Sequence, residues 1–143
     1  MYCTTLRQKI NMCFTVVSAP NLQYPTHVSN YDEGLETVLK TMELHHNFRF
    51  ILTLHCAGFA KPDSQIFHLA LDQLDNGRIK RQDVLHVGDT PEIDYIGAVN
   101  AGWNANLVHQ DAKKLTEHYQ YVEPEPVFQI LSDFQSYICM YKK

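Results

Sequence analysis

The stretch DVLHVGDTPEID, residues 83–94, decides the fold of this chain. Its first half is rich in β-branched and apolar residues, which is typical of a parallel strand buried on both faces. Asp89 and Asp94 follow where that strand ends, and Thr90 and Pro91 suit the N-cap and first-turn positions of a helix. The stretch therefore predicts a strand, a short loop and a helix, with two carboxylates at the carboxyl end of the strand.

The flanking sequence repeats this alternation of short apolar runs and longer amphipathic runs from about residue 26. Strands are expected at residues 26–30, 48–54, 83–89 and 104–109, and helices at residues 31–44, 64–75, 91–101, 111–119 and 127–137. Apolar residues at helical spacing define three inner faces: Leu35, Val38, Leu39 and Met42; Ile66, Phe67, Ala70, Leu71 and Leu74; and Ile93, Ile96 and Gly97. The pattern predicts an α/β fold, a partial Rossmann-like parallel sheet with flanking helices.

The first 25 residues do not join this alternation. MCFTVV, residues 12–17, is a candidate strand, but Pro20 and Pro25 interrupt the residues after it and leave little room for a helix. We therefore expect a poorly patterned segment at residues 1–25 and a core at residues 26–143.

Composition and charge exclude several classes of partner. Twelve lysines and arginines against sixteen acidic residues give a net charge of -4, and the basic residues are dispersed, so no nucleic-acid partner is indicated. No stretch approaches the roughly 18 apolar residues that span a bilayer, so no membrane partner is expected.

The four cysteines form no C-x-x-C pair, which favours reduced thiols and a cytoplasmic or nuclear location. Residues 7–19 loosely resemble a secretion leader, but Asn11 breaks its apolar run.

Polar side chains follow the predicted strands at their carboxyl ends, where open parallel sheets bind their ligands. They are Ser29 and Asn30, then Lys61, then Asp89 with Asp94. A hydroxyl donates to phosphoryl oxygens, a lysine offsets their charge, and carboxylates hold magnesium. Each feature also has an ordinary structural explanation as a helix cap, a solvated loop lysine or a common strand–Gly–Asp sequence. Together they outline a site for a phosphate and a divalent cation.

In their order and spacing these motifs resemble the haloacid dehalogenase-like hydrolases. The matching segments are VSN (28–30), GFAKPD (58–63) and VGDTPEID (87–94), and the resemblance covers about residues 26–110. The longer strings VSNYDEGLETVLKTMEL and HVGDTPEIDYIGAVNAGW are similar to the group of haloacid dehalogenase-like hydrolase domain-containing protein 3 and the rhythmically expressed gene 2-like proteins. Residues 26–143 would then be the C-terminal part of that family's core.

This resemblance implies magnesium-dependent hydrolysis of small phosphorylated molecules through a phosphoaspartyl intermediate. Ser29 and Asn30 would bind the phosphoryl group, and Lys61 would neutralise it together with the nucleophile. Asp89 and Asp94 would hold Mg2+ directly or through water. The hydrolase identity and these roles are expectations from the family, carried over position by position.

One essential part of the family pattern is missing from this chain. The nucleophile is an aspartate in a D-x-D-x-T or D-x-x-G-T motif on the first strand, and no aspartate precedes Asp32. Asp32 lies three residues beyond Ser29, where a helix begins, and the family's helical cap is also absent. We therefore expect an inactive chain with weak or no Mg2+ binding. The vacant strand position would permit self-association through an exposed sheet edge, unless MCFTVV fills it.

Three interpretations remain open from the sequence. The chain is a truncated or alternatively started form of a complete hydrolase, or a catalytically inactive module that binds a phosphate compound or a protein. Alternatively, it complements a second chain that supplies the first strand and the nucleophile. A signalling receiver domain is disfavoured, because it also needs acidic residues at the end of its first strand.

Overall fold

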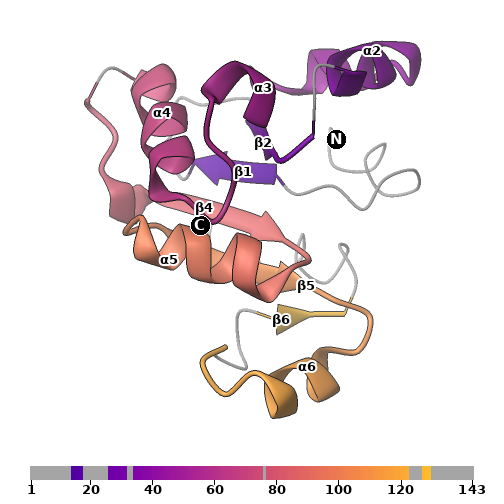
Figure 1. Ribbon diagram of the computed structural model, residues 1–143, viewed down its shortest axis with the longest axis vertical. Helices are drawn as coiled ribbons and strands as arrows, with labels where there is room; N and C mark the ends of the chain where they lie inside the picture. Colours follow the sequence, from indigo (N-terminus) through magenta and orange to yellow (C-terminus); the bar gives the residue numbers. More distant parts are fainter. Residues whose placement is uncertain (1–13, 18–25, 32–33, 76, 123–126, 130–143) are drawn as a thin grey trace, which may run out of the picture.

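The structure is a computed structural model that describes residues 14–17, 26–31, 34–75, 77–122 and 127–129, and it has an α/β arrangement of strands covered by helices (Figure 1). The described strands form a four-stranded sheet in the order β1-β4-β5-β6 and a two-stranded sheet, β2-β3. Their bounds are Phe14–Val17 (β1), His27–Ser29 (β2), Ile51–Thr53 (β3), Val84–Gly88 (β4), Asn104–Val108 (β5) and Val127–Phe128 (β6). The expected strands at 26–30, 83–89 and 104–109 are thus present, and the partial Rossmann-like fold is confirmed.

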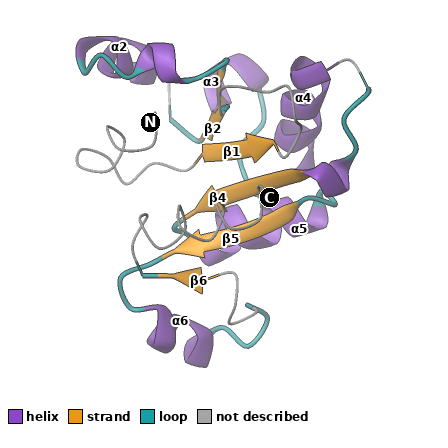
Figure 2. Cartoon of the chain, turned by 180° about the vertical axis from the view of Figure 1, so that it is seen from behind, coloured by secondary structure: helices purple, strands orange, loops and turns teal. Residues whose placement is uncertain are grey.

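Strand β1 differs in direction from the other paired strands. It runs antiparallel to β4, with Phe14 opposite Val87 and Val17 opposite Val84, whereas the pairs β2–β3, β4–β5 and β5–β6 are parallel. On its other side β1 contacts β2, and in the described residues these two strands belong to different sheets. Figures 1 and 2 show β1 between β2 and β4. The prediction that MCFTVV supplies a substitute strand is confirmed for residues 14–17; residues 12–13 lie outside the described part.

Helices complete the two layers around the strands. They are α2 (Gly34–Thr41), α3 (Leu54–Ala57), α4 (Ser64–Asp75), α5 (Gly97–Asn100) and α6 (Ala112–His118), with a π-helical turn η3 (Pro91–Ile96) directly before α5 and 3-10 turns at His45–Asn47 and Arg81–Asp83. Helix α4 begins where the sequence predicts, and the Asp63 carboxylate accepts a hydrogen bond from the Gln65 main-chain N–H. In the described part of the chain, no helix is long and apolar enough to cross a bilayer.

Successive side chains of β4 face opposite layers, as the two-residue period of a strand requires. Val84 packs into a cluster with α4 and α5, whereas Leu85 and Val87 pack with the apolar face of α2. Phe67 of α4 is fully buried in the first cluster, and it makes edge-on ring contacts with His86 and Trp103, each at a centroid distance of 5.2 Å. The layer between α4 and the sheet therefore contains a cluster of aromatic rings centred on Phe67.

Three sequence predictions about the fold are wrong in detail. Val38, predicted for the inner face of α2, is 50% exposed, and the buried residues of that helix are Leu35 and Leu39. The strand expected at 48–54 is reduced to Ile51–Thr53, since Leu54 already begins α3. The helix expected at 127–137 is instead a strand at its start, where β6 pairs with β5. Residues 130–137 lie outside the described part.

Phe67→Ala should lower the free energy of unfolding by about 3–5 kcal/mol, because it removes a ring from the centre of the core and leaves a cavity. The matched control Val38→Ala should change it by less than about 0.5 kcal/mol, because that side chain is half exposed. Urea unfolding followed through the fluorescence of Trp103, the single tryptophan, measures both values. Equal losses in the two variants would contradict the assignment of the core to the α4 layer.

Candidate functional site

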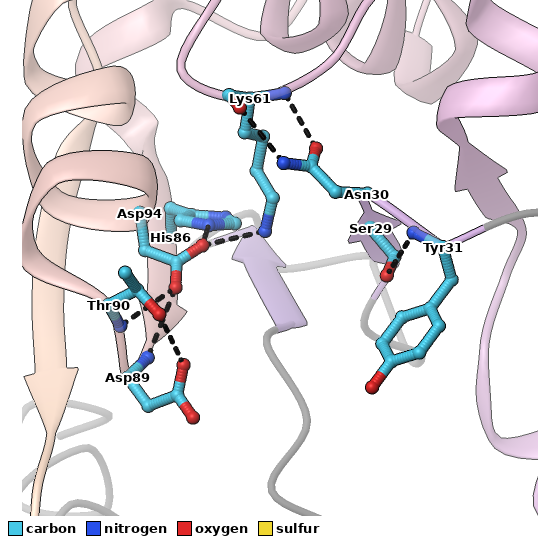
Figure 3. Close-up of polar contacts among 8 residues, drawn as sticks. All are labelled: Ser29, Asn30, Tyr31, Lys61, His86, Asp89, Thr90 and Asp94. Carbon is cyan, nitrogen blue, oxygen red and sulfur yellow. Dashed lines mark hydrogen bonds and ion pairs between the residues drawn. The ribbon is translucent and has the colours of Figure 1, made fainter.

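The residues predicted to carry chemistry come from three separate segments. Ser29 and Asn30 lie at the end of β2, Lys61 lies in the loop before α4, and Asp89 follows β4. Asp94 comes from the π-helical turn η3. Figure 3 shows Lys61 reaching from its loop to the Asp94 carboxylate, with Asp89 below and Ser29 on the opposite side.

The Asp94 carboxylate is the centre of this arrangement. Its Oδ1 accepts hydrogen bonds from Lys61 Nζ at 2.6 Å and from His86 Nε2 at 3.2 Å. Its Oδ2 accepts from the main-chain N–H groups of Asp89 at 3.2 Å and Thr90 at 3.1 Å. A carboxylate has about four accepting positions, so these four donors fill them. Because an ionised carboxylate can only accept, His86 Nε2 must carry the proton in this contact.

Burial and charge act in opposite directions on Asp94, which is only 3% exposed. Burial alone raises the pKa of its carboxyl group, since water no longer solvates the charge. The hydrogen bond from His86 and the positive charge of Lys61 outweigh burial, and together they hold the pKa of Asp94 well below its usual range. Asp94 is therefore ionised and forms a buried ion pair with Lys61 at neutral pH.

Gly88 and the π-helical turn explain why the chain can bring this carboxylate inside. A Cβ atom at Gly88 would lie 2.2 Å from Asp94 Cγ, so only glycine leaves room for the side chain. The turn also changes the inner face that the sequence predicts for the segment. Asp94 and Tyr95 are buried in it, whereas Ile93 and Ile96 are only partly buried. The regular 3.6-residue period missed this because a π-helical turn is wider than an α-helical one.

Asn30 contacts Lys61 through its side chain. Its Oδ1 accepts from the Lys61 main-chain N–H at 2.7 Å, and its Nδ2 donates to the Lys61 carbonyl at 2.9 Å. The Ser29 hydroxyl oxygen accepts from the Tyr31 main-chain N–H at 3.2 Å, and Ser29 is 4% exposed. The amide that the sequence assigned to substrate binding is thus bonded to protein, and it ties the end of β2 to the lysine loop.

The described residues do not by themselves fit a magnesium site. Asp89 is exposed, and its Oδ1 accepts a hydrogen bond from the Thr90 hydroxyl at 3.0 Å. Thr90 stands at the N-cap position, as predicted, but its side chain does not cap the helix. Asp94 has no accepting position left, and no group of three metal-binding side chains occurs in the described part of the chain. Mg2+ prefers octahedral oxygen ligands, and Asp89 alone would hold it weakly.

His86 is the site residue that the sequence reasoning missed. It is fully buried within β4 and contacts Asp94 on the same side of the strand as Gly88. Burial is the main cause that lowers the pKa of His86, the charge of Lys61 lowers it further, and Asp94 opposes both. The sequence did contain a sign that His86 belongs to the site, because it is a polar residue within an apolar strand. It stands two residues before Gly88, and a two-residue spacing puts both residues on one face of the strand.

These observations define an α/β protein with a polar site at the carboxyl ends of parallel strands. The chain belongs to the haloacid dehalogenase-like hydrolase family, whose sequence model matches residues 5–108. Its sequence is 31% identical to the rhythmically expressed gene 2 protein of Drosophila melanogaster over 113 aligned residues. This alignment covers 78% of this chain and 44% of that protein. It is also 40% identical over 81 residues to haloacid dehalogenase-like hydrolase domain-containing protein 3 of Bos taurus, covering 57% of this chain and 31% of that protein.

Solved structures agree with this fold. A haloacid dehalogenase-type phosphatase from Thermococcus onnurineus superposes with a TM-score of 0.67 at 18% identity, over 79% of this chain and 49% of that structure. The chain thus spans less than half the length of these two curated relatives and about half of this structure. Family and fold are shared over that part.

Asp94→Asn should lower the free energy of unfolding by about 3–5 kcal/mol, because it leaves the buried Lys61 ammonium without its counter-charge. Asp89→Asn makes the same chemical change at an exposed carboxylate and should cost less than about 1 kcal/mol. Urea unfolding at pH 7 and low salt compares the two. Similar costs for both variants would contradict the central role of Asp94.

The buried, neutral His86 should make stability depend on pH. Its folded pKa lies below the unfolded value of about 6.5, so the unfolded chain binds the proton first and stability is lost as pH falls below that value. The slope contributed by one such group reaches at most about 1.4 kcal/mol per pH unit. Unfolding measured from pH 7.5 to 5 should therefore show a flatter profile in His86→Gln than in the wild type. Parallel profiles would show that another group causes the pH dependence.

Proposed function

We propose that this chain is the phosphoryl-binding part of a phosphatase-type site of the haloacid dehalogenase-like family, and that it does not hydrolyse phosphomonoesters as an isolated chain. The direction of β1 is the observation that carries this proposal. Because β1 is antiparallel to β4, its amino end lies at the edge of the sheet where β4 ends. The strand has the sequence FTVV, so it contains no carboxylate at either end.

The phosphoryl-binding half of the proposal rests on the side chains near that edge. The hydrogen bond from the Tyr31 main-chain N–H uses a lone pair of the Ser29 hydroxyl oxygen and not its hydrogen, so this contact leaves the hydroxyl able to donate to a ligand. Lys61 has a positively charged ammonium group, which donates to Asp94 at 2.6 Å. Serine and lysine held in this way suit the binding of an anion such as a small phosphorylated molecule.

The proposed lack of activity rests on the contacts that the Asp94 and Asp89 carboxylates already make. A phosphoaspartyl intermediate requires an attacking carboxylate oxygen that is not blocked. Both oxygens of Asp94 already accept hydrogen bonds, and Asp89 stands where the family would use it for Mg2+. Loss of a catalytic nucleophile commonly costs several orders of magnitude in rate. Turnover would then need a nucleophile from a longer polypeptide or from a second chain.

The test combines turnover with binding on the purified chain. With Mg2+ and an aryl phosphate, the wild type and Asp89→Asn should both release no phosphate above the blank. Inorganic phosphate, titrated in an NMR experiment, should shift signals of the wild type, and Ser29→Ala should weaken that binding because it removes a donor. Thr116→Ala, at a partly exposed position of α6 away from the site residues, is the control that should leave binding unchanged.

Each half of the proposal can fail separately. Turnover that disappears in Asp89→Asn would show that the chain has a nucleophile and would overturn the inactivity. If the wild-type chain binds no inorganic phosphate up to high millimolar concentration, the proposal of phosphoryl binding is wrong. Membership of the family would not be affected by that result.

A further inference from the structure

The strongest observation outside the predicted roles is the double contact between Asn30 and the main chain of Lys61. One side chain satisfies both the N–H and the carbonyl of the same residue, at 2.7 Å and 2.9 Å. The two residues are 31 positions apart and belong to different loops, one after β2 and one before α4. Two hydrogen bonds to one residue fix its position and its rotation, which a single bond cannot do.

Lys61 needs such a restraint because it lies outside regular secondary structure. It belongs to the turn between α3 and α4, and Pro62, which follows it, has no main-chain N–H to anchor the turn. A lysine side chain has four methylene groups and many rotamers, so its ammonium group is placed accurately only if the main chain beneath it is fixed. Asp94 holds the far end of the same side chain at 2.6 Å.

We infer that Asn30 is a positioning residue that sets Lys61 relative to Ser29, and not a residue that contacts the ligand. Asn30 directly follows Ser29 at the end of β2, so its amide fixes the lysine loop against the strand that carries the serine hydroxyl. The two phosphoryl-binding groups are thereby held at one separation before any ligand arrives. This inference rests on the proposed function only for its ligand, since the geometry that carries it involves Asn30 and Lys61 alone.

The chain offers a matched control for this role in Asn104. Its side chain also donates to main-chain carbonyls, those of Gln82 at 2.6 Å and Val84 at 3.2 Å, and like Asn30 it is exposed. Asn104 begins β5, so it lies at the amino ends of the parallel strands, at the opposite edge of the sheet from the site. Asn30→Ala and Asn104→Ala therefore remove similar hydrogen bonds at opposite edges.

The experiment measures two properties of the folded wild type and of both variants. The first is the dissociation constant for inorganic phosphate, which Asn30→Ala should raise roughly tenfold, the effect of losing about one well-placed hydrogen bond. The second is the NMR signal of the Lys61 ε-methylene group in protein with 13C-labelled lysine, assigned by its absence from Lys61→Arg. In Asn30→Ala this signal should move toward the position of solvent-exposed lysines. Asn104→Ala should change neither property, even where it lowers stability equally.

The outcomes separate this inference from the proposed function. If Asn30→Ala leaves both the lysine signal and the phosphate affinity unchanged, or if Asn104→Ala alters them equally, Asn30 does not position Lys61. If the wild type binds no phosphate but the lysine signal moves only in Asn30→Ala, the positioning role stands and the proposed function fails. If Asn30→Ala does not fold, Asn30→Asp takes its place, because aspartate keeps the accepting oxygen and loses the donor. The NMR signal of the Lys61 ε-methylene group is then measured in Asn30→Asp and should move in the same direction.

Discussion

The buried ion pair between Lys61 and Asp94 is the interaction on which the site depends. Two charges can leave water only if each is matched and the remaining hydrogen-bonding positions are filled. His86 and two main-chain N–H groups fill those of Asp94, and the lysine loop is tied down by Asn30. Gly88 makes the space, because any larger residue there would overlap the carboxylate. Several positions that look like separate motifs in the sequence thus form one cluster, in which the two charges balance and the hydrogen-bonding positions of Asp94 are filled.

This cluster explains how the charged residues of the family signature can be buried together without a bound ligand. The lysine and the second aspartate balance each other's charge, so neither requires a ligand in order to be buried. These polar residues therefore have a structural role, which is independent of the chemical role proposed for them. Membership of the family follows from the sequence and the fold, whereas the lack of activity is a proposal that rests on the direction and the sequence of β1.

Sequence reasoning predicted those features that depend on local patterns. The strand at β4, the start of α4 and the choice of Lys61 and Asp94 as site residues all follow from apolar runs, caps and strand ends, whereas His86 was missed. It could not assign Asn30 to Lys61, because a contact between two loops has no local signature. The burial of Asp94 through a π-helical turn was also hidden, since the turn departs from the regular helical period. The direction of β1 could not be predicted, because a run such as FTVV fits either orientation equally well.

The pairing of β1 with β4 has a consequence for the order of folding. It joins residues near the beginning of the chain to residues beyond its middle, whereas β2–β3 and β4–β5 each enclose a much shorter stretch. Closing a longer loop costs more chain entropy, so the shorter pairs form more readily. We therefore expect β2–β3 and β4–β5 to assemble first, each with its own helices, and β1, which also contacts the nearby β2, to pair with β4 last. The pairing of β1 with β4, which joins the two sheets of the molecule, would then also be the first to separate when the protein opens.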